Sequence, residues 1–327
     1  MHRPRILRGI SGLIIRRVAL GLLTLLLVSI VVFAATQALP GDPARAILGR
    51  SASPDALAAL RAQLHLQQSV VGQYLHWLGG LLRGDLGTSL AAAGEPVTDL
   101  LGGRIRNSAF LVFVAAAISV PLSILIGSVS ALKRDRPLDH VSSVVLLALA
   151  ALPEFVVGIG LVVLIGINVF QWLPPVSLID PSKPVYEQLR LVWMPAITLV
   201  LAVTPYISRI MRASMIEVLE SDYVEMARLK GLPERDVVVR HALPNAIVPT
   251  IQVIALQLAY LAGGVVLVEF VFNYPGIGAA LVDAVANHDV PVVQALSMLI
   301  AVVYVGLNLL ADISTILISP RLRTSLR

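Results

Sequence analysis

The sequence predicts an all-α integral membrane protein with about six transmembrane helices. Of its 327 residues, 57% are hydrophobic and only 14% are charged, whereas soluble domains are about 45–50% apolar and about 25% charged. Long uncharged runs recur along the chain, and a helix needs about 20 such residues to cross about 30 Å of hydrocarbon. Because lipid offers no partner to backbone N–H and C=O groups, runs of this kind form helices.

Six segments qualify as spans: 16–38, 108–132, 141–171, 192–212, 246–268 and 294–318. The first apolar run, Val18–Thr36, follows arginines as a signal peptide would. It is too long for a signal h-region, and residues 39–42 form no small-residue cleavage site, so we expect a retained helix. The third segment is longer than one span requires and contains Pro153, which predicts a tilted or kinked helix.

The distribution of basic residues predicts that both termini face the cytoplasm, because lysine and arginine gather on that side. With six spans the termini share a side, and its segments hold five basic residues in 1–17, three in 133–140, six in 209–245 and three at the C-terminus. The opposite side holds six in 39–107, two in 173–191 and none in 269–293. These basic residues sit in short loops between apolar stretches, so we expect no nucleic-acid partner.

Several classes of chemistry are excluded by what the sequence lacks. It has no cysteine, which rules out disulfides, thiolate metal sites and thiol catalysis. It has no Gly-x4-Gly-Lys-[Ser/Thr] phosphate loop and no His-Glu-x-x-His or Gly-x-Ser-x-Gly element. We therefore expect no enzyme activity, metal or cofactor in this chain, and any energy that it uses has to come from a partner or from an ion gradient.

The long segment between the first two spans should contain helices. Ser53-Pro54-Asp55 has the order of an N-cap, a first-turn proline and an acidic first turn. Residues 67–82 should form an amphipathic helix, because apolar side chains recur there at helical spacing: Val70, Val71, Tyr74, Leu75, Leu78, Leu81 and Leu82. This helix would lie flat on the outer leaflet or cap the bundle.

The segment Arg212–Pro244, between the fourth and fifth spans, is polar and helix-forming. Asp222 can cap a helix, with Glu225 three residues later, and Gly231 is placed to end it. Pro233-Glu234 should start a second short helix that runs to about Leu243, and Pro244 should open the next span. The result is a helix-turn-helix on the inner face, which on physical grounds alone is also compatible with a plain amphipathic connector.

The motifs of this segment resemble a known family. Glu225-Met226-Ala227, Gly231 and His241-Ala242-Leu243-Pro244 have the spacing of the EAA loop of ABC importer permeases, Glu-Ala-Ala-x3-Gly-x9-Ile-x-Leu-Pro. Met226 replaces an alanine and His241 replaces the isoleucine. Further fragments are similar, in order, to the B-type permease subunit of dipeptide, oligopeptide and nickel ABC importers: Leu39-Pro40-Gly41-Asp42-Pro43, Gln73-Tyr74-Leu75, Gly84-Asp85-Leu86-Gly87-Thr88-Ser89, Asp222-Tyr223-Val224, Phe272-Asn273-Tyr274-Pro275-Gly276-Ile277-Gly278 and Ser319-Pro320-Arg321.

This resemblance implies a type I ABC importer permease fold in a bacterial plasma (inner) membrane. It divides the chain into 1–107, one transmembrane helix with extracytoplasmic amphipathic helices, and 108–327, a five-helix core with a coupling loop at 213–245. The loop would carry motion from an ATPase through eight residues: Asp222, Tyr223, Glu225, Ala227, Gly231, His241, Leu243 and Pro244. The implied partners are a second homologous permease subunit, two ABC ATPase subunits that bind ATP and Mg, and an extracytoplasmic solute-binding protein. Di- or oligopeptides are the expected cargo, ahead of nickel chelates or glutathione.

Candidates for the translocation path or gate are Pro153, Glu154, Asn273, Tyr274, Pro275 and Asp312. Glu154 and Asp312 are the only ionisable groups that we place within spans, where such groups are functional candidates. Glu154 would attract the amino terminus of a peptide, or would be protonated or paired with a neighbouring helix. Asp312 would lie near the inner end, where it can pair with an arginine. A secondary transporter driven by protons or sodium is the alternative function, although two distant carboxylates give it little support.

Overall fold

The computed structural model describes residues 3–38, 53–55, 57–58, 68–92 and 94–318; helices joined by turns and irregular segments make up this part of the chain, and its one β-type pairing is an isolated bridge between Thr88 and Pro96. The α-helices are α1 (Arg3–Gln37), α4 (Val70–Leu82), α5 (Val97–Leu132), α6 (Pro137–Ala151), α7 (Glu154–Leu161), α8 (Leu189–Leu219), α9 (Asp222–Leu229), α10 (Glu234–Asp236), α11 (Leu243–Phe272), α12 (Ile277–Ala286) and α13 (Val290–Ile318). Two π-helical segments, η1 (Val162–Asn168) and η3 (Val237–Ala242), and a 3₁₀ turn, η2 (Val185–Glu187), complete the list.

The predicted membrane fold is confirmed. Among the described residues, five helices are long and apolar enough to cross a membrane, and there are six if a bent pair counts as one span. The helices extend beyond several predicted spans: α1 begins at Arg3 instead of 16, and α5 begins at Val97 instead of 108. The motifs at 39–43 and 319–321 lie outside the described residues.

The third span, 141–171, is broken rather than tilted or gently kinked. α6 and the segment formed by α7 and η1 meet at 106°. Pro153 causes the break because its ring restricts the preceding residue to extended backbone, and Leu152 accordingly has φ −95° and ψ 132°. Prolines inside α5, α8 and α11 leave those helices continuous.

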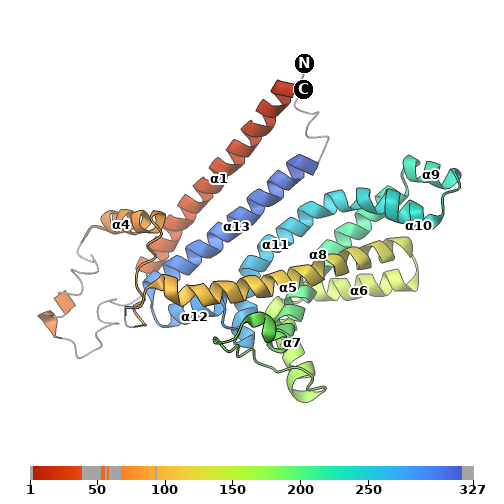
Figure 1. Ribbon diagram of the computed structural model, residues 1–327. Coiled ribbons are helices and arrows are strands. Elements are labelled where there is room, and N and C mark those ends of the chain that lie inside the picture. Colours follow the sequence, from red (N-terminus) through yellow and green to blue (C-terminus); the bar gives the residue numbers. More distant parts are fainter. Residues whose placement is uncertain (1–2, 39–52, 56, 59–67, 93, 319–327) are drawn as a thin grey trace.

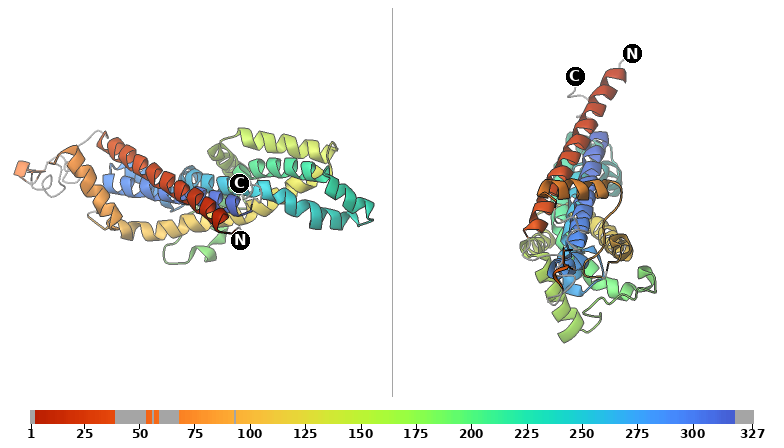
Figure 2. Two further views of the ribbon diagram at one scale, coloured as in Figure 1. Left: turned by 90° about the horizontal axis from the view of Figure 1, so that it is seen from above. Right: turned by 90° about the vertical axis from the view of Figure 1, so that its left-hand side faces the viewer.

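α8 is the central helix of the bundle. In the most apolar 18-residue stretch of α8, 67% of the residues are buried. The corresponding share is 11% in α1, which lies at the edge of the bundle (Figures 1 and 2). α5 approaches α8 closely at Gly127, where a Cβ atom would lie 2.6 Å from the Ser208 carbonyl oxygen and 2.7 Å from Met211 Cβ. Glycine is therefore required there, as small residues are at close helix contacts in membranes.

The two ends of the bundle carry different short helices. α4 and α12 lie at one end, and α9, α10 and the turn between α5 and α6 lie at the other (Figure 1). We call these the α4 end and the α9 end. The predicted amphipathic helix at 67–82 is confirmed as α4, which starts at Val70 after the cap Ser69. It packs on α1 through Tyr74 and Trp77, whose rings lie 5.4 and 5.7 Å from that of Phe33.

A buried carboxylate fixes the loop between α4 and α5. Asp289, 2% exposed at the start of α13, accepts hydrogen bonds from the Ser89 hydroxyl and from the backbone N–H groups of Leu90 (3.1 Å) and Ala91 (3.2 Å). Since an unpaired buried carboxylate is costly, these bonds hold the loop against the α12–α13 junction.

Candidate functional site

The segment between α8 and α11, residues 221–244, is called the coupling segment below. Its first helix, α9, is attached to the bundle by its small apolar side chains. Val224 and Ala227 are buried in one cluster with Met211 and Met215 of α8 and with Val237 of η3. The cluster also contains residues from the ends of α5 and α11. A displacement of α9 therefore acts on the α9 ends of these helices together.

The opposite side of α9 is an exposed apolar surface edged with acid. Tyr223, Met226 and Leu229 are 45%, 53% and 73% exposed, and they follow one another at helical spacing. Asp222 and Glu225 are exposed on the same short helix. Contiguous apolar side chains rimmed by charge are typical of protein interaction surfaces.

Gly231 ends α9 as the sequence predicted. Its φ is +78°, and the Gly231 N–H donates to the Arg228 carbonyl (2.9 Å) while the Leu232 N–H donates to the Ala227 carbonyl (3.4 Å). These two bonds form a Schellman motif, in which glycine is favoured because a Cβ atom at positive φ costs about 1 kcal/mol.

Two local predictions for this segment are wrong. The N-cap of α9 is Ser221, whose hydroxyl donates back to the Val218 carbonyl instead of capping α9, and Asp222 is the first helical residue. The second helix also does not stop near Leu243, because α10 continues through the π-helical η3 into α11. Pro244 lacks the N–H that would bond four residues back and crowds that carbonyl, and the wider π turn immediately before it relieves this conflict.

Arg228 braces the coupling segment, and the sequence analysis missed it. Its guanidinium donates to both carboxylate oxygens of Glu234, at 2.8 and 3.2 Å, and to the Leu219 carbonyl at 3.4 Å. The hydrogen bond to Glu234 raises the pKa of Arg228. The available signal was an arginine in the last turn of one helix and a glutamate in the first turn of the next, across a glycine turn.

The eight predicted coupling residues occupy four positions. Asp222, Tyr223 and Glu225 lie on the exposed side of α9, Ala227 is buried beneath it, and Gly231 forms the turn. The remaining three lie where η3 joins α11: His241 and Leu243 are half-buried, and Pro244 is exposed.

The predicted path residues Pro153 and Glu154 lie at the broken helix, where they meet polar groups of two other helices. The Tyr260 hydroxyl of α11 donates to a Glu154 carboxylate oxygen at 2.9 Å. The Tyr206 hydroxyl of α8 lies 3.5 Å from the Ala150 carbonyl at the end of α6. Broken helices with unpaired carbonyls and a carboxylate occur at the substrate sites of transporters.

Asn273, Tyr274 and Pro275 form a turn that is fastened to α5. Asn273 has the left-handed conformation (φ 49°) that ends α11. Tyr274 is fully buried and donates to the Asn107 carbonyl at 2.8 Å, while the Asn107 amide donates to the Pro275 carbonyl, also at 2.8 Å. Burial raises the pKa of the Tyr274 hydroxyl. These contacts give the turn a fixed position at the α4 end.

Glu154 and Asp312 are not the only ionisable groups inside spans. Glu269, in α11, is fully buried and accepts hydrogen bonds from the Ser108 hydroxyl and from the N–H groups of Gly278 (2.7 Å) and Ala279 (3.4 Å). It therefore satisfies the open N-terminus of α12. The sequence analysis missed Glu269 because it ended the fifth span at 268.

Asp312 lies apart from the other path candidates. It pairs with Arg17 of α1, with 2.7 Å between the charged atoms, as an acid near the inner end was expected to do. The structure thus places the six path candidates in three separate locations: the break at Pro153, the turn at 273–275, and the contact between α1 and α13.

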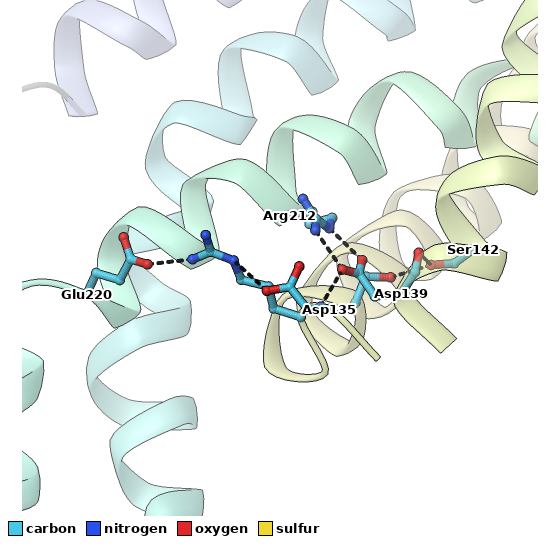
Figure 3. Close-up of polar contacts among 7 residues, drawn as sticks. Asp135, Asp139, Ser142, Arg212 and Glu220 are labelled. Carbon is cyan, nitrogen blue, oxygen red and sulfur yellow. Dashed lines mark hydrogen bonds and ion pairs between the residues drawn. The ribbon is translucent and has the colours of Figure 1, made fainter. Parts of the chain in front are cut away.

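A second acid inside the bundle joins α6 to α8. Asp139 is 2% exposed and accepts two hydrogen bonds from the Arg212 guanidinium, both at 2.7 Å, and one from the Asp135 N–H at 3.1 Å (Figure 3). Beside it, Arg134 pairs with Glu220 at the end of α8. The turn between α5 and α6 is therefore tied to the helix that leads into the coupling segment.

Within the described part of the chain, no group of three or more His, Cys, Asp or Glu side chains is placed to hold a metal ion. The polar groups described above come from different helices, in hydrogen-bonded pairs and caps.

The chain belongs to the family described as the binding-protein-dependent transport system inner membrane component, which matches residues 119–324. The N-terminal part of the same kind of component matches residues 10–118. The protein is thus a multi-pass inner membrane permease component of an ABC importer, whose ATPase activity resides in separate subunits.

Among its relatives is a probable peptide ABC transporter permease protein of Sinorhizobium fredii, 35% identical over 310 residues, which cover 95% of this chain and 98% of that protein. A putative peptide permease protein of Brucella suis is 34% identical, with the same coverage. A glutathione transport system permease protein of Escherichia coli is 34% identical over 305 residues, covering 93% of this chain and 96% of that protein. The family expected from the motifs is confirmed.

Proposed function

We propose that this chain is one of two homologous permease subunits of a peptide importer and that its coupling segment receives the motion of an ATPase. One observation carries the proposal. α9 has a buried face built into the ends of three long helices and an exposed face of Tyr223, Met226 and Leu229 that nothing in the chain covers among the described residues. A partner seated on the exposed face would move the helices through the buried one.

The proposed assembly has a second permease, two ATPase subunits that bind ATP and Mg, and an extracytoplasmic solute-binding protein. The coupling segment must face the cytoplasm for this to work, which agrees with the excess of basic residues on the side of the termini. The proposed division into an N-terminal part, 1–107, and a core, 108–327, follows the expected importer architecture.

Peptides are the proposed cargo because two relatives are named as peptide permeases and a third as a glutathione permease, and glutathione is itself a tripeptide. The proposed path passes the broken helix, where Glu154, Tyr206 and Tyr260 are at least partly exposed in the single chain. A carboxylate beside hydroxyl and carbonyl oxygens suits the protonated amino terminus of a peptide.

The experiment begins with purification of the chain in mild detergent together with its partners, followed by reconstitution in vesicles. Uptake of labelled di- and tripeptides and ATP hydrolysis are measured side by side. Glu225→Lys and Gly231→Asp should lower the peptide moved per ATP hydrolysed while leaving membrane insertion intact. Glu187→Lys makes the same charge change on the exposed turn η2, outside the coupling segment, and should leave this ratio unchanged.

Two results would contradict the proposal. Normal uptake by both coupling-segment variants would remove the coupling role of residues 221–244. Uptake that persists without the ATPase and depends on a proton or sodium gradient would instead favour a secondary transporter.

A further inference from the structure

A polar cavity lies between α5, α6 and α8, near their α9 ends, and the proposed transport function makes no use of it. Its volume is about 360 Å³, within the range of about 300–1,000 Å³ that small-molecule sites occupy. Three hydroxyls, two leucines and two guanidinium groups line it: Ser130, Ser143, Ser208, Leu146, Leu147, Arg209 and Arg212.

The charges around this cavity favour an anion. Arg212 uses Nε and Nη2 for Asp139, so that pair is close to neutral and Nη1 is left over. Arg209 makes no hydrogen bond or ion pair with any residue in the described ranges, and it is exposed. An unmatched positive charge therefore remains at the cavity.

The serine side chains at the cavity differ in what they offer a ligand. Ser208 is fully buried and its hydroxyl oxygen is closed off from the cavity, so a ligand does not reach it. The Ser130 hydroxyl is already bonded to Ser142 at 2.8 Å. Ser143 is exposed at the cavity and can donate its hydroxyl to a ligand.

The position along the helices fits the level of lipid headgroups. α8 has 31 residues, which at 1.5 Å each gives a length of about 46 Å, whereas the hydrocarbon core is about 30 Å thick. α8 is therefore about 16 Å longer than the hydrocarbon core is thick, so residues at one or both of its ends extend past the hydrocarbon. Arg209 and Arg212 lie in the last three turns of α8. The turn that follows α5 is also basic, because it contains Lys133 and Arg136.

We propose that this cavity binds a phosphoryl group, with Arg209 as the cation and Ser143 as a hydroxyl donor. Guanidinium groups match phosphate oxygens in geometry and charge. The phosphoryl group can belong to an anionic phospholipid or to a free phosphate compound. Leu146 and Leu147 offer the apolar contact that a phospholipid uses and a free phosphate does not, so the lipid is the expected source. A lipid bound here would lie against the Asp139–Arg212 pair that joins α6 to α8.

Native mass spectrometry of the delipidated full chain tests this. The probes are dioleoylphosphatidylglycerol, dioleoylphosphatidylcholine and inorganic phosphate, each titrated separately, with phosphate also added as a competitor. We expect the wild type to bind phosphatidylglycerol in preference to phosphatidylcholine. Arg209→Ala should weaken phosphatidylglycerol binding about tenfold, as the loss of a charge-assisted hydrogen bond does, and Ser143→Ala should weaken it by a smaller factor.

Arg240→Ala is the control for the loss of one exposed arginine at the α9 end outside the cavity, where Arg240 pairs with Asp236 across 3.6 Å. It should leave phosphatidylglycerol binding unchanged. Displacement of the lipid by millimolar inorganic phosphate would support the phosphoryl site and assign it to free phosphate. Equal binding of both lipids, or equal losses in Arg209→Ala and Arg240→Ala, would overturn the proposal.

Discussion

Breaking the Asp139–Arg212 pair from its two sides should have unequal effects on stability. The carboxylate side chain is 3% exposed and the arginine side chain 31%. Arg212→Ala leaves a buried carboxylate with only the Asp135 N–H as a partner, and removal of one partner of a buried pair costs about 3–5 kcal/mol. Protonation of Asp139 offsets part of that cost. We therefore expect Arg212→Ala to lower the free energy of unfolding by about 3 kcal/mol, the lower end of the range.

Asp139→Ala leaves a guanidinium that is one-third exposed and can turn toward solvent or lipid headgroups. The expected decrease in the free energy of unfolding of Asp139→Ala is therefore smaller, about 1–2 kcal/mol, and comes from the lost hydrogen bonds. The double variant should cost less than the sum of the two single variants, because the cost of the unpaired carboxylate disappears with it.

A titration with SDS in mixed micelles measures these free energies of unfolding, with the fluorescence of the three tryptophans as the signal. Asp139→Asn is a control of nearly the same shape, because it retains a hydrogen-bond acceptor but removes the negative charge. Equal losses from Arg212→Ala and Asp139→Ala, or strictly additive losses in the double variant, would refute the argument from burial.

The remaining predictions concern the turns at the two ends of the bundle. Tyr274→Phe removes the hydrogen bond from the buried Tyr274 hydroxyl to the Asn107 carbonyl and should lower the free energy of unfolding by about 1–2 kcal/mol in the same titration; an unchanged value would show that the bond contributes nothing. Gly231→Ala places a Cβ at φ +78° and should cost about 1 kcal/mol, whereas Gly79→Ala, in open space within α4, should be neutral or stabilising. Asp289→Ala should raise amide exchange at residues 89–91, whose anchor it removes, and protection equal to that of the wild type would contradict the anchoring role.

The number and type of the spans follow from composition, because lipid contact imposes apolar residues over a length set by the bilayer. The Gly231 turn was predictable for a similar reason, since the requirement for positive φ acts on one residue and needs no distant partner. Family membership followed from ordered motifs, among which the spacing from Glu225 to Pro244 was the most specific.

Features that depend on contacts between helices were not predictable. The 106° break was expected only as a kink, because the ring of Pro153 fixes a local restriction but not the direction of the next helix. Glu269 looked like a residue past the end of a span, and only the packing of α12 against α11 shows why a carboxylate is buried there. Arg228 and Asp139 likewise acquire their roles from partners that are distant or lie across a turn.

The anchors at the two ends of the bundle indicate where a movement would pivot. At the α4 end, α11 is fixed to α5 and α12 through Glu269, Tyr274 and their bonds to residues 107–108. At the α9 end, the same helix continues through η3 into the coupling segment, which is exposed and joined to the bundle by small apolar contacts. We infer that a push on α9 swings the α9 ends of α8 and α11 while the turn at 273–275 stays in place. Amide exchange during ATP turnover should therefore change near residues 237–246 and remain constant at 273–279, and the opposite pattern would place the pivot at the other end.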